Sequence, residues 1–530
     1  NNIATGGASN VTFTTTNTYS GTTKISGGST LVLGSATALG SSTLDYTNSY
    51  GGTLSFGTQT AVTLGGLMGD QNLALTNASA AAVALTVGGN QLDTTYSGSL
   101  SGSGSSVTKT GVGALTLTGT NSYTGGTTVT TGTLKGNSAS LQGNVTNNSA
   151  LVFDQGTAGT YAGALSGTGT LAKTGSGALT VNGTNTNTGT TTITNGTLQF
   201  AKVASLYNST TASWTAVNIS VASGGTLAVN VGGTGEFTTG NVTTLLTNLG
   251  GLGAAVTYNG LQAGSKIAFD TTNASGGNFT VANAIANSTG SNGGGAIGVT
   301  KLGPGSLTLS AASSYTGETT VAAGKLVVNG NISTSALTTV NSGASLGGNG
   351  TMGAAVISGS LAPGNSIGTI TATSNVTWNA GDAWVFELGS AASSLALANS
   401  GSSIQDLLNI TGAGNTLLKG TGSVFTFDFA GTGATGWYKL VDYTGTSTFT
   451  HTDFAATGLT TGLTGDFTVD SATSAIYVNV VPEPGTALLG GLGALALLRR
   501  RRSGRNVAGR KSPPEGGTTY IPEPRRFQRR

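Results

Sequence analysis

Side chains that could carry chemistry are sparse in this 530-residue chain, of which only 7% is charged. Two pairs of carboxylates lie close in sequence, Asp382 with Glu387 and Asp466 with Asp470. A glycosidase needs two carboxylates on opposite sides of the bond that it cleaves. Acidic residues without a partner are normally solvated. We therefore expect both pairs to be solvated loop charges and predict no catalytic residue among them.

The single histidine, His451, is followed two residues later by Asp453. A Ser-His-Asp triad also needs a serine on a strand-turn-helix elbow with the pattern Gly-x-Ser-x-Gly. Segments 343–347 and 364–368 have these letters, but no helical pattern follows them, and 89 glycines make chance matches common. We expect His451 to be a bystander and predict that the protein is not an enzyme.

No sequence pattern indicates a cofactor or a metal ion. Cysteine is absent, which excludes disulfides, thiolate metal sites and a cysteine nucleophile. The glycine-rich strings lack the Gly-Lys-Ser/Thr ending of a phosphate-binding loop. Calcium-binding Gly-Gly-x-Gly-x-Asp repeats are also missing. We predict no cofactor site and no metal site.

Charge is distributed unevenly along the chain. Residues 1–481 hold 10 lysines, no arginine and 15 acidic residues, a net charge of −5, whereas 11 basic residues lie in 499–530. A body without arginine has no basic stripe that could neutralise phosphates. We therefore predict that nucleic acid is not a partner, and that hydroxyl and amide groups hydrate most of the surface.

A recurring segment sets the fold. Each copy has Lys-x-Gly-x-Gly, an alternating stretch, and a Thr-Thr-Val or Thr-Thr-Ile end that runs on into Gly-x-Leu. Full copies lie at 107–129, 171–193 and 299–321, with a partial copy at 17–25. Leu115 and Leu117 alternate with threonines, which is the period of a half-buried strand. Corner glycines accept positive φ, and units this short bury their apolar face only by stacking. The sequence predicts a β-solenoid with Leu, Val and Ile inside and Thr and Ser outside.

Two features of the repeat have competing interpretations. The lysines Lys109, Lys173 and Lys301 could form a regular basic line, but single lysines at coil corners more commonly keep a flat β surface soluble. The outward threonines could hydrogen-bond sugars or ordered water, whereas ordinary solvation is the simpler interpretation. We expect exposed corner lysines and solvated hydroxyl groups.

The repeat closely resembles the autotransporter-associated β-strand repeat, whose pattern joins Thr-Lys-x-Gly-x-Gly-x-Leu-Thr-Leu to a later Asn-x-Tyr-x-Gly. One copy departs from this pattern, with Asn187 where the others have tyrosine. Segments 345–352 and 359–370 resemble the late coils of autotransporter passengers. These resemblances imply a right-handed parallel β-helix over residues 1–370. Its repeats lie at about 17–34, 107–137, 171–200 and 299–331.

Residues 371–480 differ from the repeats in composition. Three of the four tryptophans lie here, Trp378, Trp384 and Trp437, and the strand patterns are longer. We expect a β-rich terminal section that covers the unpaired edge of the last coil, because an open edge invites pairing with other chains.

A different kind of segment begins at Val481. The motif is Val481, Pro482, Glu483 and Pro484, and an uncharged apolar run follows at 486–498, before the basic cluster Arg499, Arg500, Arg501 and Arg502. A helix over this run would rise about 20 Å, short of the roughly 30 Å hydrocarbon core. The predicted short apolar helix therefore suits a temporary anchor, with the arginines on the cytoplasmic side.

This arrangement is similar to the PEP-CTERM signal of Gram-negative bacteria, which an exosortase recognises and cuts. The resemblance covers residues 481–502 and implies an exported protein with transient inner-membrane contact through 486–498. Residues 503–530 continue past the usual end of such a signal, and we predict a disordered basic tail there. We also expect that a secretory peptide precedes Asn1.

Together these features predict an exported, non-catalytic β-helix protein of the cell surface or extracellular matrix. Its role would be structural or adhesive, in a biofilm or with exopolysaccharide, and its partners would be an exosortase-type enzyme and extracellular polysaccharide. Two alternatives stay open. One is a carbohydrate-active β-helix enzyme, either a polysaccharide lyase or a hydrolase, and the other is an autotransporter-like adhesin passenger.

Overall fold

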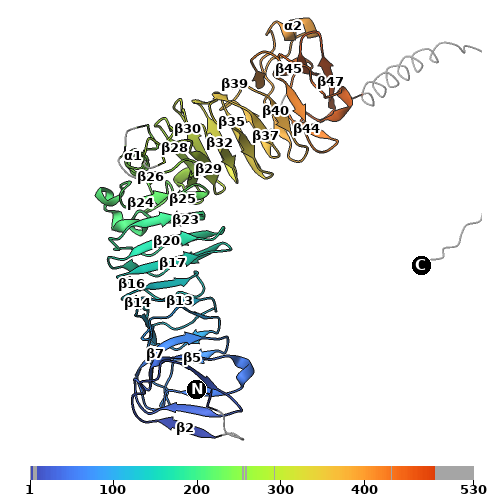
Figure 1. Cartoon of the computed structure of the whole chain (residues 1–530). Coiled ribbons are helices and arrows are strands. Elements are labelled where there is room, and N and C mark those ends of the chain that lie inside the picture. Colours follow the sequence, from blue (N-terminus) through green and yellow to red (C-terminus); the bar gives the residue numbers. More distant parts are fainter. Residues whose placement is uncertain are drawn as a thin grey trace, which may run out of the picture.

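The computed structural model describes residues 2–3, 9–253, 256, 260–291, 293–430 and 433–483, and it shows a long rod of stacked β-coils (Figure 1). Strands of successive coils pair in parallel along the rod, which is the predicted parallel β-helix. Figure 1 also shows that the rod changes direction beside helix α1 (Thr239–Asn248).

Three long parallel sheets form the faces of the rod. The first has nine strands in the order β1-β3-β5-β7-β9-β12-β14-β16-β19. The second runs from β10 (Thr94–Tyr96) to β26 (Gly260–Leu261), and the third from β18 (Gly159–Tyr161) to β43 (Leu417–Lys419). The nine strands of the first sheet are β1 (Asn2–Ile3), β3 (Thr22–Ile25), β5 (Leu39–Asp45), β7 (Ala61–Met68), β9 (Ala84–Val87), β12 (Ser106–Lys109), β14 (Thr127–Val129), β16 (Val145–Asn147) and β19 (Leu165–Ser166).

The core is a set of inward columns in which like residues stack on one another. Leu115 pairs in register with Leu134, Leu134 with Leu151, and Leu151 with Leu171, on strands β13 (Ala114–Leu117), β15 (Thr133–Gly136), β17 (Ala150–Asp154) and β20 (Thr170–Thr174). All four leucines are at most 5% exposed. The predicted alternation of inward leucine and outward threonine is therefore confirmed.

Two irregular segments are inserted into the coils between β23 (Gly196–Phe200) and β27 (Lys266–Asp270). Short 3₁₀ turns follow β23, and helix α1 lies between β25 (Gly225–Asn230) and β26. Thr238 caps this helix, since its hydroxyl accepts the Asn241 N–H while Asn241 Oδ1 accepts the Thr238 N–H. The helix buries Val242, Leu245 and Leu246 against the rod. This insertion coincides with the change of direction in Figure 1.

The terminal section first continues the parallel coils and then ends them with antiparallel strands. Strands β39 (Thr369–Ala372), β42 (Leu407–Ile410) and β45 (Gly436–Asp442) pair in succession, so parallel pairing crosses the predicted boundary at 370/371. Strand β48 (Ala475–Pro482) then pairs antiparallel with β45 and with β47 (Leu463–Asp470). Trp378 and Trp384 stack in the core beneath, with ring centroids 3.8 Å apart.

The predicted apolar helix at 486–498, the arginine cluster and the tail at 503–530 lie outside the described residues. Within the part of the chain that the structure describes, no helix combines the length and the apolar character needed to cross a membrane.

Candidate binding surface and sorting segment

The repeat lysines are buried, so the expectation of exposed corner lysines was wrong. Lys109, Lys173 and Lys301 are at most 1% exposed. Lys173 lies in an inward column, in register with Phe153 on one side and Ile193 on the other. The alternation could have shown this, because each lysine stands two residues after an inward residue of the same strand, as Lys173 does after Leu171.

Each buried ammonium is bonded to the corner of its own coil and to that of the next coil. Lys173 Nζ donates to the carbonyl oxygens of Thr174 and Gly175, both at 2.7 Å, and of Asn195 at 3.2 Å. Lys109 and Lys301 each bond the equivalent three carbonyls, two in their own coil and one in the next. A lysine has three donors, so all are used inside the protein. Each repeat lysine therefore links the corners of two consecutive coils, which we call a stapling role. The three lysines do not form a row of exposed positive charges that a partner could bind.

Burial lowers the pKa of all three lysines, and that of Lys301 falls to about 8. Lys301 therefore remains mostly charged at neutral pH. One coil before the third full copy, the position equivalent to the repeat lysine is apolar, because Phe269 stands in register with Lys301.

A column of hydroxyl groups runs along the outer face of the first sheet. Thr63, Thr86, Thr108, Thr128, Thr146 and Ser166 pair in register on six adjacent strands. Strands in a sheet lie about 4.8 Å apart, so the hydroxyls repeat at that spacing. No charged residue interrupts this threonine column, and all of its members are at least partly exposed.

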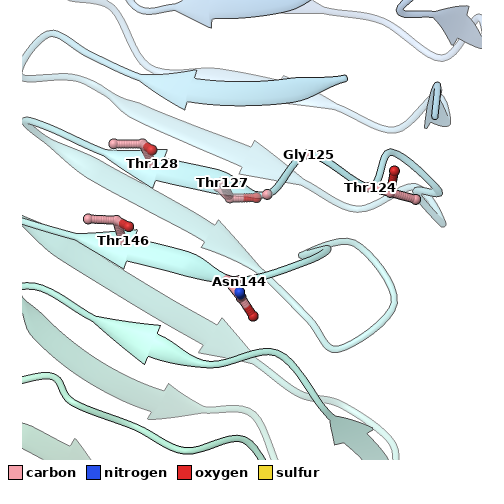
Figure 2. Close-up of a pocket in the computed structure, with 7 residues that line it drawn as sticks. Thr124, Gly125, Thr127, Thr128, Asn144 and Thr146 are labelled. Atoms are coloured by element: carbon pink, nitrogen blue, oxygen red, sulfur yellow. The ribbon is translucent and has the colours of Figure 1, made fainter. Parts of the chain in front are cut away.

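A shallow hollow opens beside the threonine column (Figure 2). Figure 2 shows Thr128 and Thr146 side by side on neighbouring strands, with Asn144 and Thr127 where these strands begin. The hollow has a volume of about 190 Å³ and is lined by Thr124, Gly125, Gly126, Thr127, Thr128, Asn144 and Thr146. Its lining is neutral and rich in hydroxyl and amide groups, which suits hydroxyl-bearing ligands better than ions.

The predicted acidic pairs have different surroundings. Asp382 accepts the N–H of Gly343 at 2.5 Å, whereas Glu387 is exposed. Asp466 and Asp470 lie on strand β47 and not in a loop, which corrects the sequence interpretation. Asp470 accepts the Ala472 N–H and the Thr473 hydroxyl, and these donors hold the pKa of its carboxyl below the usual value.

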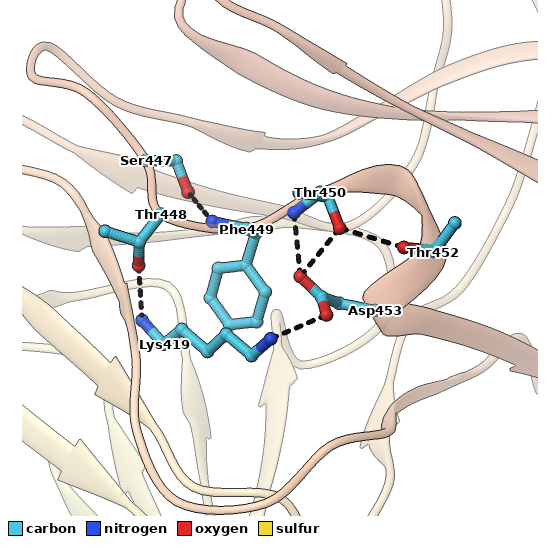
Figure 3. A network of polar contacts seen from close by, with 7 residues as sticks. All are labelled: Lys419, Ser447, Thr448, Phe449, Thr450, Thr452 and Asp453. Atoms are coloured by element: carbon cyan, nitrogen blue, oxygen red, sulfur yellow. Dashed lines mark hydrogen bonds and ion pairs between the residues drawn. The ribbon is translucent and has the colours of Figure 1, made fainter.

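Asp453 is bonded to Lys419 and Thr450, as Figure 3 shows. Lys419 Nζ lies 2.6 Å from Asp453 Oδ1, while Oδ2 accepts the N–H and the hydroxyl of Thr450. Burial opposes ionisation of Asp453, but these donors outweigh it and hold the pKa of the carboxyl below its usual value. His451 is exposed in the same 3₁₀ turn. The structure therefore brings Asp453 together with Lys419, where the triad hypothesis required His451.

The two serine motifs do not lie on nucleophile elbows. Ser345 is within strand β35 (Ala344–Gly348), and Ser366 is in an exposed turn between β38 (Ser360–Pro363) and β39. Across the described ranges, no group of three or more His, Cys, Asp or Glu side chains is placed to hold a metal ion.

Sequence reasoning missed several buried carboxylates, and Asp406 is the least exposed of those that the structure describes. It accepts the N–H groups of Gly368 and Glu387, both at 2.8 Å, and so ties the turn after β38 to the terminal section. Burial raises the pKa of Asp406 to about 6, although the two N–H donors favour its ionised form. Both of these hydrogen bonds come from backbone groups of the protein, which indicates a structural role.

The sorting segment begins inside the last strand. Val481 and Pro482 pair with Thr464 and Leu463 of strand β47. The Glu483 N–H then donates to the Gly462 carbonyl at 2.8 Å. Val481 is partly buried, and Pro482 and Glu483 are exposed. Pro484 and the four arginines lie outside the described residues.

Comparisons with known proteins agree with these features. Four segments match the family model described as Passenger-associated-transport-repeat, at residues 6–33, 107–135, 171–200 and 299–328. Residues 480–502 match the PEP-CTERM protein-sorting motif. A stretch of 52 residues, 9% of the chain, is 52% identical to the Adhesin BmaC autotransporter of Brucella suis biovar 1 (strain 1330), of which it covers 2%.

The chain is thus a parallel β-solenoid that carries autotransporter-associated repeats and a PEP-CTERM motif, which confirms both predicted resemblances. The repeats and the motif point to an exported protein of the cell surface or the medium. The motif also implies recognition by an exosortase.

Proposed function

We propose that this protein is a non-catalytic rod of the cell surface or extracellular matrix that binds neutral polysaccharide along its threonine column. An exosortase sorts it, and residues 486–498 anchor it transiently in the inner membrane. The observation that carries the binding proposal is the uncharged column from Thr63 to Ser166, which presents hydroxyls at one regular spacing along a rigid sheet.

The chemistry of this face favours neutral sugars. Polysaccharide hydroxyls both donate and accept hydrogen bonds, and threonine hydroxyls do the same. A single bond of this kind contributes little in water, since it replaces a bond to solvent. Six hydroxyls in one column could act together on one extended chain, because each added contact is intramolecular once the first has formed.

The binding proposal is tested by co-sedimentation of the purified protein with an insoluble neutral β-glucan and, in parallel, with an anionic polyuronate gel. We expect pelleting with the glucan that is insensitive to salt, because no charges are involved. Pelleting with the polyuronate alone would reject the proposal. An assay for new reducing ends in the same tubes should stay at background, and a rise would favour the enzyme alternative.

The sorting proposal has a separate test, which is intact mass and C-terminal peptide mapping of the protein recovered from its native envelope or medium. We expect a C-terminus close to Pro482–Pro484. A chain that still ends at Arg530 would reject processing.

A second candidate function is adhesion to other cells or host surfaces. The 52% identity to an adhesin autotransporter over 52 residues favours it. The chain spans only 2% of that adhesin, so the similarity concerns a short stretch of the rod. Cells that display the rod should then adhere better than cells lacking it, also after their polysaccharide has been removed.

A further inference from the structure

We propose that the folded terminal hairpin, strands β47 and β48, controls the access of the processing enzyme to the sorting motif. This inference rests on the proposed sorting by an exosortase. It comes from one juxtaposition: the match to the sorting motif starts at residue 480, whereas strand β48 continues to Pro482. The folded body and the motif therefore share Val480, Val481 and Pro482, and no spacer separates them.

The strand that enters the motif is held firmly. Strand β48 is the second-last strand of the terminal sheet, and Tyr477, Val478 and Val480 on it are fully buried. Pairing with β45 ends at Val480, opposite Gly436. Pairing with β47 continues through Pro482, and the Glu483 N–H extends it by one bond to Gly462.

Pro482 is compatible with this extended pairing. In an antiparallel ladder, hydrogen-bonded and non-hydrogen-bonded residue pairs alternate. The bond from Glu483 to Gly462 makes these two a hydrogen-bonded pair, so Pro482 and Leu463 form a non-bonded pair. The N–H that proline lacks would have pointed away from β47, where β45 has already ended. The proline at position 482 therefore removes no hydrogen bond from the sheet.

This pairing competes with processing. A proteolytic enzyme acts on a segment that is open and extended in its active site, and a closed segment is cut in proportion to how much of the time it opens. In the folded protein Val481 pairs with Thr464 of β47, and the Glu483 N–H is bonded to the Gly462 carbonyl, so both residues that flank Pro482 are held on β47. The enzyme must therefore bind the motif before the hairpin closes, or separate residues 462–464 from it.

Two variants change hairpin opening in opposite directions and leave residues 481–502 contiguous and unchanged. A flexible six-residue Gly-Ser insertion between Val480 and Val481 detaches the motif from β47. The same insertion between Gly401 and Ser402, in an exposed turn, is its matched control. The double substitution Asp466→Cys with Asn479→Cys joins a register pair of the hairpin outside the motif. The pair is of the hydrogen-bonded type, with Cα atoms about 5.5 Å apart, which is within the range that a disulfide spans.

The readout is the fraction of chain that has lost Arg530, followed over time by intact mass in cells that contain the exosortase. We expect several-fold faster processing with the insertion at 480/481 and an unchanged rate with the control insertion. The oxidised double-cysteine protein should be processed several-fold more slowly, and reductant should restore the rate. The chain has no other cysteine, so this disulfide is unambiguous. The single-cysteine variants should behave as wild type.

Equal rates for all forms would overturn the inference while the proposed sorting stands. Slower processing with the insertion at 480/481 would overturn it too, since a paired strand would then be the preferred substrate. A wild-type chain that keeps Arg530 in these cells would reject the sorting itself, and with it any control by the hairpin.

Discussion

The Tyr207 hydroxyl lies 3.0 Å from the Thr191 hydroxyl and replaces a contact that the sequence of this repeat has lost. In other copies the partner is the tyrosine four residues before the threonine, as in Tyr123 with Thr127 at 2.7 Å. The second copy has Asn187 there, and a tyrosine from a later 3₁₀ turn completes the same bond. The equivalent threonine therefore has a buried tyrosine partner in both repeats. In one repeat the tyrosine lies four residues before the threonine, and in the other it comes from a later turn.

Tyr207→Phe should lower the free energy of unfolding by about 1–2 kcal/mol, because the Thr191 hydroxyl loses a buried partner. Tyr123→Phe should cost a similar amount, since Thr127 loses the equivalent bond. Urea denaturation followed by circular dichroism measures both. If Tyr207→Phe is neutral and Tyr123→Phe is not, Tyr207 does not replace the missing tyrosine.

Lys173→Met should destabilise the rod far more than a surface lysine substitution. It leaves three carbonyls at a coil corner without their donor, which should cost on the order of 2–4 kcal/mol. The control is Lys135→Met, which removes a half-exposed ion pair with Asp154 and should cost about 0–1 kcal/mol. Equal losses in urea denaturation would contradict a stapling role for Lys173.

The lowered pKa of Lys301 should make the free energy of unfolding depend on pH, and the direction of the pKa shift decides the sign of that dependence. Burial lowers that pKa from 10.5 to about 8. Between pH 8 and 10.5 the unfolded chain holds a proton on this amine that the folded chain has lost, so stability rises with pH in this window. Below pH 8 both states are protonated and the contribution is constant.

The comparison of wild type with Lys301→Met isolates this contribution, because methionine does not titrate. We expect the difference in unfolding free energy, wild type minus variant, to grow from pH 8 to 10.5. A difference that is flat or shrinks would show that the three carbonyl acceptors outweigh burial and keep the amine charged.

Gly111→Ala and Gly343→Ala separate steric crowding from backbone strain. Both glycines have positive φ, +70° and +77°. A Cβ at 111 would lie 2.0 Å from the Gly88 carbonyl oxygen of the previous coil, whereas nothing lies within 4 Å at 343. We expect a cost of about 1–2 kcal/mol at 343 from φ alone and a clearly larger cost at 111. Equal melting temperatures for the two variants would mean that the coils can move apart.

The sequence pattern predicts the solenoid well because stacking repeats one simple alternation. Leu115 and Leu117 are buried as expected. The repeat model matches at all three full copies, and its first match begins at residue 6, earlier than the partial copy at 17–25. The lysines were misplaced because charge was given more weight than strand parity. The three carbonyl groups that accept hydrogen bonds from each ammonium come from two consecutive coils. The sequence of one repeat therefore does not show that the lysine has buried partners.

Other features depend on contacts between segments that are distant in sequence. The replacement of the missing tyrosine by Tyr207 depends on a turn between two strands, where periodicity carries no information. The bond between Lys419 and Asp453 spans 34 residues. The sorting motif is recognised from its sequence, but the sequence does not show that Val481 and Pro482 are the last residues of strand β48.

The threonine column can be tested by removing hydroxyls without changing shape. Thr86→Val, Thr108→Val and Thr128→Val, combined in one variant, keep the β-branched side chains and delete three adjacent hydroxyls. Since valine suits strands as well as threonine does, the fold should persist. A matched control replaces three exposed threonines outside the column, Thr58, Thr157 and Thr211, by valine.

If the column binds neutral glucan cooperatively, the loss of three central hydroxyls divides it into short pieces. Co-sedimentation with β-glucan should then weaken at least about tenfold, because contacts that acted on one chain no longer act together. The control variant should pellet as wild type does, and circular dichroism should confirm that both remain folded. Equal binding by the two variants would place any polysaccharide contact elsewhere on the rod, since the deleted hydroxyls would then contribute nothing to it.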